Sequence, residues 1–188
     1  MKKNFIVLIG ILVISLNVFS SAFAQSKKST SELRIILIRH GEKPDDGDNL
    51  SCAGINRSLK LPAVLKGKFG VPDYIYVPTP NTGKKTKNAR MLQTVTPLAA
   101  KYNLNINTNY SVDDAQDLAR NITNASGTVL VVWEHKELAE IATALGIRNA
   151  PDWKANDFDS IWIITFKHGH ASLAIDREGI VPANGCPF

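Results

Sequence analysis

Residues 33–41 read LRIILIRHG, a mostly apolar and β-branched run that leads into Arg39, His40 and Gly41. An uninterrupted run of this kind is typical of a strand buried on both faces, as in the middle of a parallel sheet. The following residues, up to Asn49, include a proline, a second glycine and four acidic residues, so they are predicted to form a loop. The predicted strand therefore ends at an arginine and a histidine.

Strand-like and helix-like segments alternate outward from this first strand. Further strands are predicted over 74–77, 106–110 and 128–133, with a hairpin of 160–166 and 171–175 around His168-Gly169. Helices are predicted from a Ser51 cap to Phe69, over 88–102, from a Ser111 cap to Ile122 with Asp113 and Asp114 in the first turn, and over 136–145. This alternation favours a three-layer α/β fold, in which a mostly parallel sheet carries helices on both faces.

Arginine and histidine residues recur where these strands end. Arg39 and His40 end the first strand, Glu134 and His135 follow the strand over 128–133, and Arg90 comes a loop after the strand over 74–77. Because the carboxyl ends of parallel strands share one edge, and ligands bind at that edge, we expect these side chains to converge there.

The convergence of these residue types indicates a phosphate pocket. Arginine presents a planar fork of donors that matches phosphate oxygens, and a neutral histidine can act as a nucleophile or as an acid–base group. We therefore hypothesise that His40 attacks phosphorus while Arg39, Arg90 and His135 hold the phosphoryl oxygens. Each residue alone is more often an ordinary surface residue, so the prediction depends on the convergence. It requires neither a metal ion nor a cofactor.

Four short motifs resemble those of one protein family. LIRHGE at 37–42 resembles the signature of the histidine phosphatase superfamily, the phosphoglycerate mutase-like proteins. LSCAGINR at 50–57, RMLQT at 90–94 and VVWEH at 131–135 are similar to further family motifs, and all four occur in family order. The resemblance implies a phosphoglycerate mutase-like fold, with His40 as phospho-acceptor and Arg39, Arg90 and His135 completing the pocket. It also implies a phosphorylated small-molecule substrate and no cofactor or metal.

The chain departs from the family pattern in two places. Residues 81–89, which include three lysines, separate Arg90 from Thr79-Pro80, where the family places its second arginine only a few residues on. The general acid that protonates the leaving oxygen is not evident either, because Lys136 stands where one branch of the family has Asp. The candidate acids are Asp113 and Asp114, which are preferred but could equally be helix caps, together with Glu134 and Glu42.

The N-terminal residues are typical of a secretory signal peptide. Lys2 and Lys3 precede the apolar run FIVLIGILVI at 5–14, and the pattern ends at Ala22-Phe23-Ala24. The run is shorter than the ~20 apolar residues that cross a bilayer, so we expect cleavage after Ala24 and no stable membrane anchor afterwards. The predicted organisation is a signal peptide (1–24), a flexible leader (25–32) and one histidine phosphatase-like domain (33–188), located in the periplasm or secreted.

Charge and cysteine content add two further expectations. Loss of Lys2 and Lys3 would lower the formal charge from +5 to +3, a mild excess that does not favour nucleic acid as a partner. Cys52 and Cys186 are the only cysteines. In an exported protein they could form a disulfide, and the sequence equally allows two free thiols.

The sequence thus favours an exported phosphatase that hydrolyses a phosphomonoester or a related phosphoryl compound through a phosphohistidine at His40. The alternative is a non-catalytic phosphate- or anion-binding protein of the same fold. The reason for this alternative is that the sequence shows no evident general acid.

Overall fold

A computed structural model describes residues 32–81 and 88–188 of the chain. The predicted signal peptide, most of the predicted leader, and residues 82–87 of the segment before Arg90 lie outside the described residues. The strands are β1 (Arg34–Arg39), β2 (Tyr74–Pro78), β3 (Ile106–Tyr110), β4 (Thr128–Trp133), β5 (Ser160–Lys167) and β6 (His170–Arg177). The helices are α1 (Cys52–Phe69), α2 (Ala89–Tyr102), α3 (Ala115–Ile122) and α4 (His135–Ala144).

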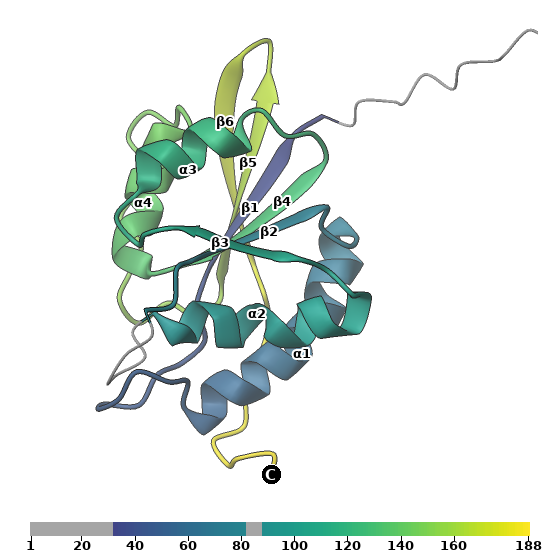
Figure 1. Cartoon of the computed structure of the whole chain (residues 1–188), viewed down its shortest axis with the longest axis vertical. Helices are drawn as coiled ribbons and strands as arrows, with labels where there is room; N and C mark the ends of the chain where they lie inside the picture. Colours follow the sequence, from purple (N-terminus) through teal and green to yellow (C-terminus); the bar gives the residue numbers. More distant parts are fainter. Residues whose placement is uncertain (1–31, 82–87) are drawn as a thin grey trace, which may run out of the picture.

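The six strands form one mixed sheet in the order β3-β2-β4-β1-β5-β6 (Figure 1). The first four strands in this order are parallel to one another, and the β5–β6 hairpin joins the edge of β1 antiparallel. In the β1–β4 pairing, Arg39 lies opposite Trp133, so both strands end at the same level. The prediction of a three-layer α/β fold with a mostly parallel sheet is confirmed.

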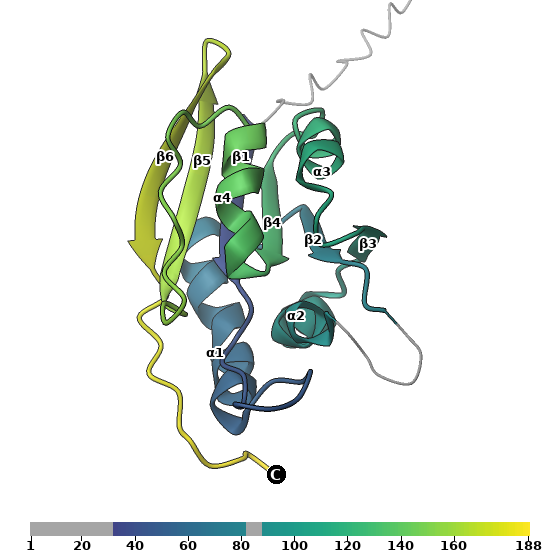
Figure 2. The same cartoon turned by 90° about the vertical axis from the view of Figure 1, so that its left-hand side faces the viewer.

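Alternate residues of the central strands face opposite helical layers. Ile35 and Leu37 of β1 pack into a core with α3 and α4, whereas Ile36 and Ile38 pack into a second core with α1 and α2. Figure 2, turned by 90°, shows α4 in front of β1, on the face that it covers. Burial on both faces explains why β1 and β4 are continuous apolar runs, since neither strand has a side that meets water.

One helix start differs from its prediction. The helix expected to begin at Ser111 begins at Ala115, so Asp113 and Asp114 precede it. The Asp114 carboxylate accepts a hydrogen bond from the Ser111 N–H at 2.9 Å, and the Asp114 N–H donates to the Ser111 carbonyl at 3.1 Å. These two bonds close a turn over 111–114, so the helix begins only after this turn, at Ala115.

A C-terminal segment, residues 178–188, runs from β6 alongside α1 (Figure 1). A disulfide joins Cys52, the first residue of α1, to Cys186. Asn56 donates to the carbonyls of Ala183 at 3.0 Å and Gly185 at 2.7 Å. Of the two alternatives, a disulfide or two free thiols, the structure contains the disulfide. The bond fastens the C-terminal segment to the start of α1.

We expect that replacing both cysteines by serine lowers the free energy of unfolding by about 2–4 kcal/mol. The bond closes a loop with a sequence separation of 134, and a long cross-linked loop restricts the unfolded chain strongly. Thermal unfolding of the chain from Gln25, followed by circular dichroism, measures the effect. A reductant should shift the midpoint of the wild type but not that of the double variant, and equal midpoints without reductant would contradict the expectation.

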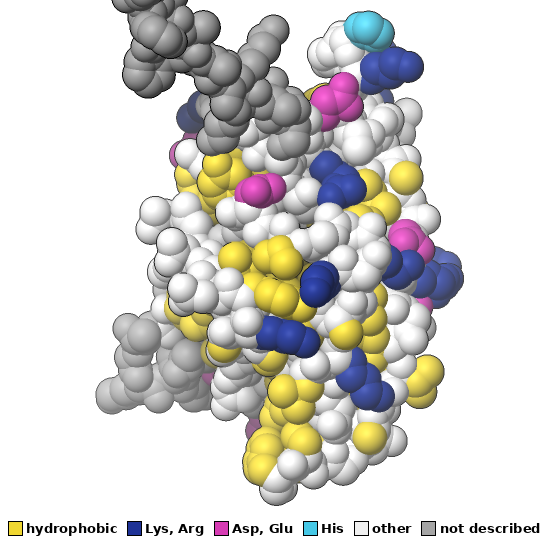
Figure 3. Space-filling view, turned by 90° about the vertical axis from the view of Figure 1, so that its right-hand side faces the viewer, with side chains coloured by type: hydrophobic (Ala, Val, Ile, Leu, Met, Phe, Trp, Pro, Cys, Tyr) yellow, Lys and Arg dark blue, Asp and Glu magenta, His cyan; other side chains and the backbone are white. Residues whose placement is uncertain are grey.

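The surface view in Figure 3 shows one face, on which Lys and Arg side chains are spread among hydrophobic and other groups. The mild positive charge is therefore distributed over this face and not concentrated in one patch. Among the residues that the structure describes, no helix is both long enough and apolar enough to span a bilayer.

Candidate active site

His40 lies directly after β1, at the carboxyl edge of the sheet. Its backbone N–H donates to the Trp133 carbonyl at 3.2 Å, which ties the residue to the end of β4. Its ring is buried, and Nδ1 lies 2.7 Å from the Gly41 carbonyl oxygen. A carbonyl can only accept, so Nδ1 carries the proton and Nε2 keeps an unprotonated lone pair. His40 is therefore held in the tautomer that a nucleophilic Nε2 requires.

The surroundings of His40 keep its ring uncharged. Burial lowers the pKa of His40 to about 3. The hydrogen bond to the Gly41 carbonyl, the second-largest effect, opposes this lowering, and the charges of Arg39, Arg90 and, when it is protonated, His135 add to it. These three predicted site residues therefore lie close enough to His40 to affect its charge. A neutral imidazole surrounded by cationic groups can approach a phosphate dianion without first losing a proton.

We expect nuclear magnetic resonance to find the His40 imidazole neutral at pH 5, with its proton on Nδ1. Because an unfolded histidine binds a proton near pH 6.5 and the folded His40 does not, this residue makes folding less favourable as the pH falls from 6.5 towards 3. The ¹⁵N shifts of the ring, assigned by their loss in His40→Gln, give the charge and the tautomer. A protonation midpoint at or above 6.5 would contradict the predicted environment.

Arg39 is buried beside His40, and its guanidinium is held by backbone. Nη1 donates to the carbonyls of Ala155 at 2.5 Å and Asp157 at 3.4 Å. The guanidinium carbon lies 3.9 Å from the centre of the Phe158 ring. Burial lowers the pKa of Arg39 to about 10, opposed in part by the charge of Glu134, so the group remains cationic at neutral pH.

Arg90 reaches the site from the first turn of α2. Its Nη1 donates to the Gly47 carbonyl at 3.1 Å. The Thr94 hydroxyl donates to the Arg90 carbonyl at 2.7 Å and accepts from the Gly41 N–H at 2.9 Å. Thr94 thus joins the helix that carries Arg90 to the loop that carries His40, which gives a physical role to the RMLQT motif.

His135 is the first residue of α4, directly after β4. Burial lowers its pKa, and the charge of Arg39 lowers it further. Within the described residues, four buried side-chain nitrogens have no hydrogen-bond partner, and three of them belong to predicted site residues: Arg39 Nε, Arg90 Nε and His135 Nδ1. Buried polar atoms are normally satisfied, so these three nitrogens have hydrogen-bonding capacity that the described residues leave unused. The fourth, Arg34 Nε, belongs to the start of β1, at the opposite end of that strand from the predicted site.

The loop after His40 packs directly on the first turn of α1. A Cβ on Gly54 would lie 2.3 Å from the Glu42 carbonyl oxygen, and one on Gly41 would lie 3.0 Å from the Gly54 carbonyl oxygen. Ser51 caps the helix by accepting from the Gly54 N–H at 3.2 Å. Both glycines are thus required by close backbone contact, and this contact accounts for their places in the RHG and LSxxG motifs.

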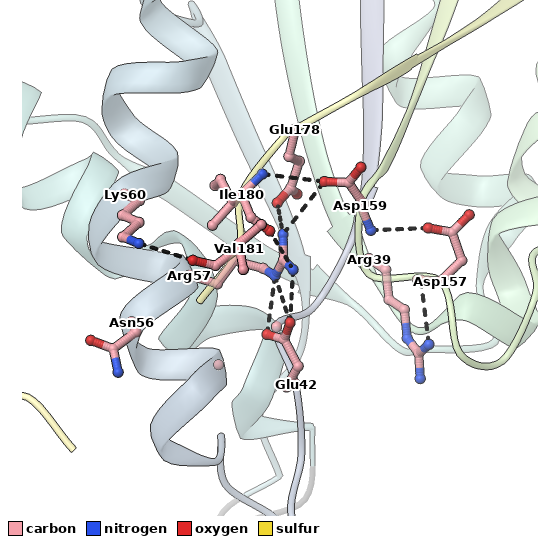
Figure 4. Close-up of polar contacts among 12 residues, drawn as sticks. Arg39, Glu42, Asn56, Arg57, Lys60, Asp157, Asp159, Glu178, Ile180 and Val181 are labelled. Atoms are coloured by element: carbon pink, nitrogen blue, oxygen red, sulfur yellow. Dashed lines mark hydrogen bonds and ion pairs between the residues drawn. The ribbon is translucent and has the colours of Figure 1, made fainter. Parts of the chain in front are cut away.

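Glu42 is engaged by a buried ion network (Figure 4). Arg57 of α1 donates to both carboxylate oxygens of Glu42, with Nε at 3.0 Å from each and Nη2 at 2.7 Å from Oε1. The same guanidinium bonds Glu178 at 2.5 Å and lies 4.0 Å from Asp159. Burial raises the pKa of Glu178 to about 7; Arg57 opposes the rise, and the charges of Asp159 and Glu42 add to it. Both carboxylate oxygens of Glu42 therefore accept hydrogen bonds from Arg57, which gives Glu42 a structural role in this network.

The other candidate acids differ in their surroundings. Asp114 is engaged with the Ser111 N–H, whereas Asp113 is exposed beside it. The preceding residue, Val112, accepts a hydrogen bond from the indole of Trp133 at 2.7 Å, which places this turn at the end of β4. Glu134, partly buried, exerts the largest charge effect on the Arg39 pKa. Asp113 and Glu134 thus remain as possible proton donors. The described residues hold no cluster of three His, Cys, Asp or Glu side chains suited to a metal.

Sequence reasoning missed two parts of this site. The segment 153–159, which contacts Arg39, contains no recognisable motif, and the ion network of Arg57 was not predicted. The only available signal for Arg57 was its position at the end of the LSCAGINR motif.

The chain resembles known proteins in structure and not in sequence. No protein-family profile matches it, and no curated protein sequence matches it. A structure of the protein histidine phosphatase SixA with tungstate is 15% identical with a TM-score of 0.59, covering 77% of this chain and 97% of that one. A mycobacterial glucosyl-3-phosphoglycerate phosphatase with inorganic phosphate is 13% identical with a TM-score of 0.55, covering 76% and 95%.

A phosphoserine phosphatase variant from Entamoeba histolytica, in complex with phosphoserine, is 17% identical with a TM-score of 0.52, covering 78% of this chain and 97% of that chain. At these identities the similarity concerns the fold, and it extends over nearly the full length of each neighbour. The strand order, the two helical layers and these neighbours together identify the fold of the chain as phosphoglycerate mutase-like.

Proposed function

We propose that the protein is an exported phosphatase that forms a phosphohistidine at His40. The observation that carries the proposal is the group of three unsatisfied nitrogens, on Arg39, Arg90 and His135, around a buried and neutral histidine. A phosphoryl group supplies the acceptor oxygens that these nitrogens lack. The neighbours in fold, among them phosphatases bound to phosphate or to a phosphorylated substrate, support the same chemistry.

The reaction proceeds in two displacements. Nε2 of His40 attacks phosphorus, a P–N bond forms, and the bond between phosphorus and the leaving oxygen breaks. Water then attacks the phosphohistidine, the P–N bond breaks, and inorganic phosphate leaves with His40 neutral again. In both steps Arg39, Arg90 and His135 stabilise the charge on the equatorial oxygens, which is the main contribution of a protein to phosphoryl transfer.

The leaving oxygen needs a proton in the first step. Asp113 and Glu134 are the carboxyl groups that remain after Glu42 and Asp114 are assigned to structural hydrogen bonds. An aryl oxygen or an imidazole nitrogen leaves readily without such help, so we propose that substrates of these two kinds react most easily.

A phosphate-release assay on the purified chain from Gln25 tests this function. The panel contains an aryl phosphate, phosphoserine and a phosphohistidine peptide, with Arg90→Ala as the matched variant. We expect release from the aryl phosphate and the phosphohistidine peptide, and at least a tenfold lower kcat/KM in Arg90→Ala. No release from any member of the panel would refute the enzyme and favour the anion-binding alternative, for which the absence of a clear general acid is the motive.

Export is a separate proposal. It is supported by the sequence of residues 1–24 and by the Cys52–Cys186 bond, since disulfides persist mainly in oxidising compartments. N-terminal sequencing of the protein recovered outside the cytoplasm should begin at Gln25. A chain that stays in the cytoplasm with Met1 or Lys2 at its start would contradict it.

A further inference from the structure

The segment from Trp153 to Asp159, between α4 and β5, supplies the contacts that Arg39 makes with its own chain. Two backbone carbonyls of this segment, those of Ala155 and Asp157, accept from Nη1, and the guanidinium carbon of Arg39 lies over the Phe158 ring, 3.9 Å from its centre. The Phe158 ring also lies 6.1 Å from the His40 ring, in an edge-on arrangement. One short segment therefore touches both members of the Arg39-His40 pair.

The segment is held rigidly by its own hydrogen bonds. The buried indole of Trp153 donates to the Asp157 carbonyl at 2.8 Å and packs on Trp162, with ring centres 4.8 Å apart. The Asp157 carboxylate accepts from the Asp159 N–H at 2.9 Å and from the Ser160 N–H at 3.0 Å and hydroxyl at 2.6 Å. Asp157 thus turns its carboxylate towards β5 and its carbonyl towards Arg39, as Figure 4 shows.

These contacts restrict the orientation of the guanidinium. The two backbone carbonyls hold Nη1 of Arg39, and the Phe158 ring lies against the guanidinium. Nε of Arg39 has no partner among the described residues. A ring stacked on a guanidinium is attracted to the cation without using any of its donors. The arrangement therefore fixes Arg39 and leaves its remaining donors available to an anion.

We infer that Phe158 is a positioning residue for the predicted phosphate pocket of Arg39, His40, Arg90 and His135. It acts through Arg39, because its ring holds the Arg39 guanidinium against the carbonyls of Ala155 and Asp157. The inference rests on the proposed function, because it takes the bound anion to be a phosphoryl group. It adds to that function a residue outside the four motifs, on a segment without a recognisable pattern. The half-buried ring contributes no donor to the anion, so its effect must pass through the arginine.

The test measures the affinity of inorganic phosphate by isothermal titration calorimetry, with no turnover required. Stacking of this kind is worth about 0.5–2 kcal/mol, so Phe158→Leu is expected to raise the phosphate Kd roughly 2- to 30-fold. Phe158→Trp keeps a ring against the guanidinium and should stay within about threefold of the wild type. Phe166→Leu is the matched control, because Phe166 is a half-buried phenylalanine at the far end of β5.

A double-mutant cycle decides whether Phe158 acts through Arg39. In an Arg39→Ala background the further change Phe158→Leu should alter the phosphate Kd by less than about twofold, because the contact it removes is already gone. Equal effects in both backgrounds would overturn the inference, as would an unchanged Kd in Phe158→Leu or no phosphate binding by the wild type. A loss of affinity in Phe158→Leu that Phe158→Trp does not avoid would also overturn it, because it would indicate general disturbance of the fold.

The binding readout separates this inference from the proposed function. If phosphate binding depends on Phe158 only when Arg39 is present, and the protein hydrolyses no substrate, the phosphatase is refuted and the positioning role of Phe158 stands. Hydrolysis at the wild-type kcat and KM in Phe158→Leu, with an unchanged phosphate Kd, would refute the positioning role and leave the phosphatase standing.

Discussion

Replacing His40 by alanine is expected to lower kcat for an aryl phosphate by at least about 10³-fold. The variant removes the neutral imidazole that is held after β1 with its proton on Nδ1, while Arg39, Arg90 and His135 remain to bind phosphate. Loss of a covalent nucleophile usually costs at least this factor, and binding groups alone recover little of it. Phosphate affinity should change much less than kcat, and comparison of the two quantities checks the assignment.

His170→Ala is the control for this experiment. His170 is exposed at the start of β6, at the end of the molecule away from the carboxyl edge of β1, and should retain the wild-type kcat. Thermal midpoints of both variants, measured by circular dichroism, establish that each is folded. A folded His40→Ala that hydrolyses the aryl phosphate at the wild-type rate would show that His40 is not the nucleophile.

Replacing Arg57 by methionine is expected to lower the free energy of unfolding by about 3–5 kcal/mol. The substitution keeps most of the aliphatic stem, removes the guanidinium, and leaves Glu42 and Glu178 without the cation that binds both. Removing one partner of a buried ion pair costs this much because the remaining carboxylates stay buried without it. Urea unfolding at pH 8, above the raised pKa that Glu178 has beside Arg57, measures the loss relative to a wild type in which that carboxylate is ionised.

Two variants test the cause of the loss. Arg177→Met removes an exposed arginine 3.5 Å from Asp159 and should cost less than about 1 kcal/mol, as surface pairs do. Adding Glu178→Gln to Arg57→Met should recover part of the stability, because it removes one of the uncompensated charges. If Arg57→Met and Arg177→Met lower the free energy of unfolding equally, the buried ion network stabilises the fold no more than an exposed ion pair does.

The ion network around Arg57 is linked to the loop that follows His40. Arg57 fixes the Glu42 side chain, Gly54 packs on the Glu42 backbone, and Glu42 lies two residues after His40. The C-terminal segment contributes Glu178 and the Ile180 carbonyl to the same guanidinium. Residues from the two ends of the domain therefore support the loop that follows His40, and the Cys52–Cys186 disulfide also joins α1 to the C-terminal segment.

The sequence was most informative where one local pattern determines one local structure. The apolar run at 128–133 predicts β4 with its observed bounds, and Ser51 is the cap of α1 as expected, because burial on both faces and helix capping depend on neighbouring residues alone. The strand-end rule placed Arg39, His40 and His135 at one edge. Their roles in the reaction stay predictions that the experiments above test.

What the sequence could not reveal depends on contacts between distant residues. The carbonyls of Ala155 and Asp157 reach Arg39 across 116 and 118 positions, and backbone carbonyls leave no trace in residue identity. Arg57 meets Glu178 across 121 positions. The late start of α3 shows a limit even at short range, because the Asp114 carboxylate that could have capped a helix closes a turn with Ser111 instead.

The most direct measurement of the central claim is the detection of a phosphoryl group on His40 during turnover. An aryl phosphate is mixed with the chain from Gln25, the reaction is stopped with alkali within milliseconds, and the peptides are analysed by mass spectrometry. We predict a transient, acid-labile phosphoryl group on the peptide that contains His40, absent from His40→Ala. Hydrolysis of the aryl phosphate with no covalent phosphoryl group, or with that group on another residue, would contradict the account.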